Sequence, residues 1–213
     1  TPIVWEEAWG TGLSTGLQLI TGVSGAANIE WTPEMTPDGL TANIAYSPKV
    51  SAGANIGDKA SSGSGGALNS GWDVVLTATD AITGIEGLTL YAGISDVDQS
   101  TNAAAISGNK SEETIAAVYA MGGFTFGYQW SEEDTGRAST NTKYDNTAYG
   151  ITFNVNDDLT IGYNNYESEQ TSTTNTTLEL ETIQIAYTMG GATITLAEAE
   201  GTNMSYQTTA AFD

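Results

Sequence analysis

Acidic side chains are the residues with the greatest capacity for chemistry in this sequence. The chain has 26 Asp and Glu against 5 Lys and Arg, a formal net charge of -21, which disfavours a nucleic-acid partner. Paired carboxylates can hydrolyse glycosides, but no fixed spacing marks such a pair here. Histidine and cysteine are absent, which removes the usual general base, the Ser–His nucleophile pair and thiolate sites. We therefore expect no enzyme activity.

Clustered carboxylates also offer the oxygen ligands that calcium prefers. The weak calcium candidates are Asp96, Asp98, Glu132 and Asp134. None of them lies in an EF-hand pattern, and solvated loop charge is the simpler interpretation. The sequence predicts no metal and no cofactor, with calcium as the open alternative.

The elements that position these residues follow from a period-2 alternation of apolar and polar side chains, which predicts β-strands. It recurs about ten times. Phe124, Phe126 and Tyr128, for example, alternate with Thr125 and Gly127. No apolar run approaches the roughly 20 residues of a membrane helix.

The connections between these segments alternate in length. Short ones lie near residues 33–39, 80–87, 122–123, 156–158 and 190–191, and long polar ones near 48–71, 96–112, 131–146 and 166–178. All long loops then lie at one end of a meander, as in outer-membrane barrels. The sequence predicts an all-β, transmembrane, antiparallel up-and-down β-barrel.

Charge distribution agrees with a membrane barrel. We expect the basic residues, Lys49, Lys59, Lys110, Arg137 and Lys143, and most clustered acids to lie in the long loops, away from lipid. The candidate aromatic girdle consists of Trp31, Tyr46, Trp72, Tyr119, Tyr128, Trp130, Tyr149 and Tyr163. The opposite face is polar, and its candidate lumen-facing residues are Glu30, Asn43, Asp73, Thr77, Thr89, Gln129, Asn154 and Gln184.

Three segments carry a family resemblance. The stretch ANIEWTPEMTPDGLTANIAYSP and the phrases AAVYAMGGFTFGYQW and IQIAYTMGGATITLAEAE resemble hairpins of the trimeric general-diffusion porins of Gram-negative bacteria, particularly the alphaproteobacterial type. The resemblance implies a barrel of about 16 strands, a homotrimer in the outer membrane, and about ten of those strands in this chain. Residues 1–26 would be the end of the in-folded third external loop and 27–213 barrel strands, with N-terminal strands and the final strand missing.

The resemblance also implies a function, the passive diffusion of small hydrophilic solutes and ions. Glu6 and Glu7 are the candidate carboxylates of the pore constriction. Carboxylates at a narrow pore attract cations, so we expect cation preference, with Glu30 and Asp73 as further contributors. The alternatives are a self-closing barrel of ten strands, a barrel that acts as a receptor through its loops, and a secreted or surface β-sandwich that binds or adheres.

Overall fold

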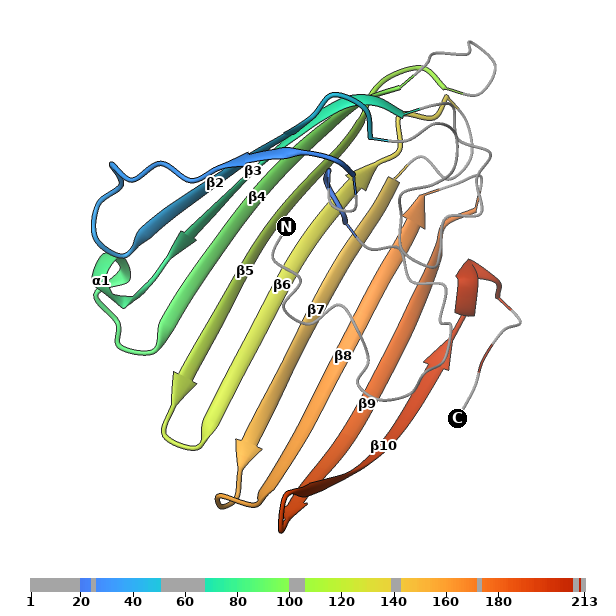
Figure 1. Ribbon diagram of the computed structural model, residues 1–213. Coiled ribbons are helices and arrows are strands. Elements are labelled where there is room, and N and C mark those ends of the chain that lie inside the picture. The colour runs from blue at the N-terminus through green and yellow to red at the C-terminus, as the bar shows by residue number, and fades with distance from the viewer. Residues whose placement is uncertain are drawn as a thin grey trace.

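The computed structural model describes residues 20–23, 26–50, 68–99, 106–138, 143–171, 174–208 and 211. These residues form one antiparallel sheet of ten strands, each paired with the next in chain order (Figure 1). The strands are β1 (Ile29–Trp31), β2 (Leu40–Ser47), β3 (Leu68–Ala78), β4 (Leu88–Gln99), β5 (Lys110–Met121), β6 (Phe124–Asp134), β7 (Lys143–Asn154), β8 (Leu159–Thr171), β9 (Thr176–Met189) and β10 (Ala192–Thr202). The predicted ten-strand meander is confirmed.

Two short helical elements accompany the sheet. They are α1 (Asp80–Thr83) in the connection from β3 to β4 and η1 (Met204–Tyr206) after β10. Neither of these described helices has the length and apolar composition needed to cross a bilayer.

The predicted short turns are where the local sequence places them. Between β9 and β10, Gly190 and Gly191 have φ values of 57° and 87°. A two-residue type I′ turn needs positive φ at both positions, which glycine adopts without steric cost. This turn pairs Met189 directly with Ala192.

The strands are longer than predicted at the other end of the sheet. Hydrogen-bonded pairing runs from β5 to β6 up to Ser111 and Asp134, and from β6 to β7 up to Lys143. The expectation that the clustered charges lie in loops is therefore wrong for the following residues, all of which are strand residues: Lys110, Lys143, Asp96, Asp98, Glu112, Glu132, Glu133, Asp134, Asp145, Glu167 and Glu169. Backbone pairing continues without an apolar–polar alternation, so the sequence signal stops before the strands do.

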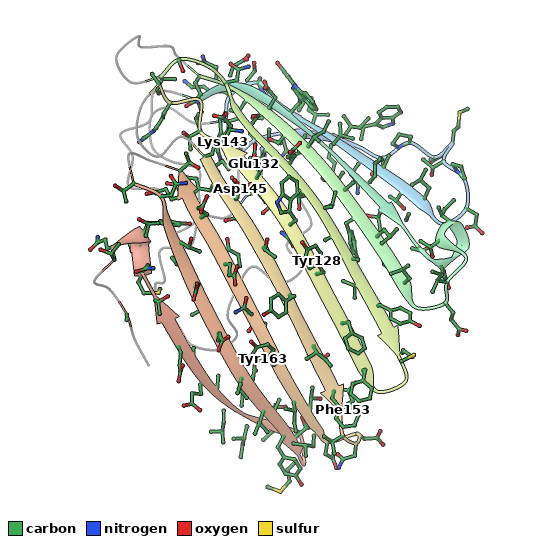
Figure 2. The ribbon with its side chains drawn as sticks, turned by 180° about the vertical axis from the view of Figure 1, so that it is seen from behind. Tyr128, Glu132, Lys143, Asp145, Phe153 and Tyr163 are labelled. Atoms are coloured by element: carbon green, nitrogen blue, oxygen red, sulfur yellow. The ribbon has the colours of Figure 1, made fainter. Side chains whose placement is uncertain are left out.

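The sheet is curved, and Figure 1 looks onto its concave face while Figure 2 looks onto the convex face. The register puts the apolar side chains on the convex face. Ile94, Ile115 and Ile183 there are 51%, 54% and 53% exposed. In the described residues no second sheet covers this face, so the β-sandwich alternative is wrong.

The two edge strands of the sheet show whether these ten strands close into a barrel by themselves. β1 and β10 are the edge strands, and no pairing joins them in the described part of the chain. The ten strands thus form an open, curved sheet, and the alternative of a self-closing ten-stranded barrel is not what the structure shows.

Candidate functional site

The concave face carries the polar side chains. The register places Asp73 beside Ala45 and Ser95, and Gln129 between Ala116 and Ala148. The same alternation puts every candidate lumen-facing residue on this face: Glu30, Asn43, Asp73, Thr77, Thr89, Gln129, Asn154 and Gln184. Their contact with a pore solution stays a prediction.

A short segment of chain lies against this wall. The backbone N–H of Thr21 donates to Glu112 Oε2 at 3.1 Å, Gly22 N–H donates to the same oxygen, and Val23 N–H donates to Asp73 Oδ2 at 3.2 Å. Ile20 and Val23 are almost completely buried. Two carboxylates on β3 and β5 therefore hold three consecutive backbone N–H groups. We call residues 20–23 the docked segment.

Gly22 is the residue that permits this approach. Its φ is 57°, and a Cβ atom built there would lie 2.5 Å from Asp73 Oδ2. Any side chain would push the backbone away from the carboxylate that binds Val23. Glycine is thus required both by the backbone conformation and by the space.

A buried ion group supports the docked segment. Lys110 Nζ is paired with Glu112 and lies 2.9 Å from Glu133 Oε2. The Lys110 side chain is 13% exposed and the two glutamates are 3% exposed. One ammonium compensates two carboxylates that the register places side by side, which buried charges require. We call Lys110, Glu112 and Glu133 the wall triad.

Sequence reasoning missed the wall triad because it assigned these residues to loops. The signal that could have found it is local. Lys110 and Glu112 are two positions apart, which puts both side chains on one face of a strand. Extending the β5–β6 hairpin from its Gly122–Gly123 turn then brings Glu133 opposite Glu112.

The predicted constriction residues fall in different places. Glu6 and Glu7 lie outside the described residues. Asp73 is 8% exposed and occupied by the docked segment, whereas Glu30 on β1 is exposed. Of the two wall carboxylates proposed to attract cations, Glu30 is the one open to solution.

The calcium candidates are engaged by protein donors. Asn109 Nδ2 donates to Asp96 Oδ1 at 2.8 Å and to Asp98 Oδ1 at 3.0 Å, while Glu132 pairs with Lys143 at 2.8 Å. Asp134 accepts the N–H of Gly136. Over the described ranges, no group of three or more acidic side chains is arranged to hold a metal ion. Calcium binding, the alternative to the predicted absence of a metal, stays untested.

The convex face carries the aromatic side chains. By register all candidate girdle residues lie on it: Trp31, Tyr46, Trp72, Tyr119, Tyr128, Trp130, Tyr149 and Tyr163. Sequence reasoning did not include Phe124 and Phe153, which stack at the short-turn end with centroids 4.3 Å apart. Figure 2 shows Phe153 at that end, and Glu132, Lys143 and Asp145 at the opposite one. Aromatic and aliphatic side chains along the face, with charged residues at the end of the long connections, fit a membrane-spanning face.

Solved structures share this fold. OmpT, an outer membrane protein of Vibrio cholerae, matches with a TM-score of 0.59 and 15% identity, over 99% of this chain and 66% of its own. A refined porin structure matches with a TM-score of 0.52 and 14% identity, over 82% of this chain and 54% of its own. This chain therefore spans less than two thirds of either protein.

The family itself comes from the sequence. A comparison with curated proteins finds no match. A sequence model described as Gram-negative porin, however, matches residues 4–207. The match covers nearly the whole chain, and the protein therefore belongs to the Gram-negative porins, β-barrel proteins of the bacterial outer membrane.

Proposed function

We propose that the protein forms a water-filled channel through which small hydrophilic solutes and ions diffuse passively across the outer membrane. The observation that carries this proposal is the docked segment on a polar, acidic wall whose other face is apolar. In the proposal, residues 1–26 narrow the channel and Asp73 and Glu112 anchor their end. No chemical step is needed, since selection rests on size and charge.

The channel is proposed to prefer cations. The concave face of the described strands carries Glu30, Asp73, Glu112 and Glu133, whereas of the two lysines in those strands Lys110 is concave and Lys143 convex. This excess of negative charge raises the local cation concentration in a narrow space with low-dielectric walls. Glu6 and Glu7 stay the proposed carboxylates of the constriction itself.

The test is electrical. The full-length protein, inserted in planar bilayers, should give stepwise conductance and a reversal potential in a KCl gradient that indicates cation preference. Glu6→Gln and Glu7→Gln should together lower that preference. The matched control is Glu34→Gln, an exposed residue of the short connection between β1 and β2. Folded, inserted protein that does not conduct would overturn the channel, and an unchanged reversal potential would remove Glu6 and Glu7 from the constriction.

A homotrimer is proposed as the assembled form. The resemblance implies it, and the convex face of β9 and β10 supports it, because Glu181, Glu198 and Glu200 lie there among apolar residues. Carboxylates that face lipid hydrocarbon are destabilising, so contact with another subunit suits this face better. Light scattering of the detergent-solubilised protein should give three times the chain mass. A monomeric mass would overturn the trimer without affecting the channel.

A further inference from the structure

The chain after β10 folds back over the concave face. Asn203, Ser205 and Tyr206 have φ values of 52°, 54° and 58°. Three non-glycine residues in the left-handed region within four positions are rare, because the Cβ atom clashes with the backbone there. Such a conformation persists where surrounding contacts hold it. We call residues 203–206 the returning segment.

Apolar packing supplies part of the contacts that stabilise the returning segment. Met204 is 7% exposed and belongs to a buried cluster with Ala148, Tyr166, Leu178, Leu180 and Ala199. The register places the cluster's strand residues on the concave face, where Tyr166 is opposite Ala148 and Leu180. This apolar cluster on the concave face is explained by the returning segment, which covers it.

Polar and aromatic contacts also attach the returning segment to strands further along the sheet. Asn203 Nδ2 donates to the Thr177 carbonyl oxygen on β9 at 2.7 Å, and the Tyr206 hydroxyl lies 2.6 Å from Ser168 Oγ on β8. The Tyr206 ring also meets the Tyr144 ring on β7, with centroids 5.2 Å apart. From β10 the returning segment thus reaches three strands along the wall, which is roughly 14 Å at the usual strand spacing.

We propose that the returning segment is a second constriction of the channel, at the barrel end that carries the long connections, and that Tyr206 is its positioning residue. This inference rests on the proposed channel function. The docked segment is held by β3 and β5, whereas the returning segment is held by β7, β8 and β9. The two therefore narrow the channel from different parts of its wall.

The returning segment is expected to select by size and not by charge. Its four residues, Asn203 to Tyr206, carry no ionisable carboxylate or ammonium. Loosening it should widen the passage without changing the sign of the field in the pore. Conductance and reversal potential then separate its effect from that of the acidic wall.

The first experiment replaces the positioning residue in the full-length protein. Tyr206→Ala removes both the ring contact with Tyr144 and the bond to Ser168, so single-channel conductance and the uptake of larger neutral sugars by proteoliposomes should rise while reversal potential stays constant. Tyr206→Phe keeps the ring and should give a smaller rise. The matched control is Tyr128→Ala, which truncates a tyrosine on the convex face of β6, away from the proposed subunit contact, and should leave conductance unchanged.

A second experiment does not depend on Tyr206. The sequence has no cysteine, so Ser205→Cys would supply a single thiol at an exposed position of the returning segment. A bulky thiol reagent should lower the current through open channels of this variant and not of the wild type. Unchanged current after complete labelling, or a Tyr206→Ala variant that inserts and conducts like wild type, would overturn the second constriction. If the folded, inserted wild-type protein does not conduct at all, the proposed channel function itself would be contradicted, independently of the second constriction.

Discussion

Asp73 accepts a hydrogen bond from the backbone N–H of Val23, with 3.2 Å between Oδ2 and N, and this bond joins positions 50 apart in the chain. It fixes the docked segment to β3, while Glu112 fixes the preceding residues to β5. Hydrogen bonds to charged acceptors contribute about 1.5–3 kcal/mol each. The anchor of the proposed constriction is therefore made by two side chains on neighbouring parts of the wall.

Removing one of these carboxylates should loosen the docked segment. In Asp73→Ala the Val23 N–H loses its acceptor, and a loss of about 1.5–3 kcal/mol corresponds to amide exchange that is roughly ten to a hundred times faster. Hydrogen–deuterium exchange of the segment measures this directly, and open-channel current noise should increase in parallel. Asp73→Asn keeps an oxygen acceptor and should show a smaller effect. Equal exchange rates in wild type and Asp73→Ala would contradict the anchor.

The wall triad predicts a large cost for removing its cation. Lys110→Met takes away the ammonium that Glu112 and Glu133 share while both glutamates stay buried side by side, which should lower the free energy of unfolding by about 3–5 kcal/mol. Urea unfolding in lipid vesicles measures the loss, and adding Glu133→Gln should restore part of it.

The control for the wall triad is the exposed lysine of the convex face. The Lys143 side chain is 42% exposed where it pairs with Glu132, so Lys143→Met should cost under about 1 kcal/mol. Similar losses for the two methionine variants would show that the buried triad has no special role.

Alanine substitutions at two glycines distinguish the cost of a left-handed backbone conformation from the cost of a steric clash. Gly84 and Gly87 have φ values of 69° and 79°, but a Cβ atom has open space at Gly84 and would lie 2.1 Å from the Ala120 carbonyl oxygen at Gly87. Gly84→Ala should cost about 1–2 kcal/mol from conformation alone. Gly87→Ala should cost clearly more, since the start of β4 must move away from β5. Comparable urea midpoints would contradict the close approach at Gly87.

Strand number, order and facing could be predicted because their signals are local. Alternation such as Phe124, Phe126 and Tyr128 against Thr125 and Gly127 specifies which face each residue takes. Glycine pairs specify the turns, as at Gly190 and Gly191. These features need no knowledge of distant parts of the chain.

The long ends of the strands could not be predicted in the same way. Residues 131–134 are Ser, Glu, Glu and Asp, so both faces of β6 are polar there and no alternation exists to detect. Glu132 pairs with Lys143 on the convex face while Glu133 joins the wall triad on the concave one. Neighbouring residues of this acidic run therefore lie on opposite faces of the sheet, and only the pairing register shows which residue lies on which face.

The two inward-folded segments depend on long-range contacts. Gly22 reads as an ordinary loop glycine until Asp73 is placed beside it. Met204 and Tyr206 follow a strand and show no periodicity, while Leu178 and Leu180 look like a misplaced apolar pair on the polar face of β9. An apolar interruption on the lumen-facing register was the available signal for a segment that covers the wall.

The assignment of faces makes a final prediction, in which one substitution has opposite consequences on one strand. Leu76 lies on the convex face of β3, 41% exposed, between Ala42 and Ala92, and Thr77 lies on the concave face. A lysine facing lipid hydrocarbon costs up to about 2–4 kcal/mol, so Leu76→Lys should lower the unfolding free energy in vesicles by an amount of this order. Thr77→Lys should leave stability nearly unchanged, because its ammonium would reach water, and should shift the reversal potential toward anions. If Thr77→Lys instead unfolds the protein while Leu76→Lys is tolerated, the concave face is not the water-filled one, and both proposed constrictions fail with it.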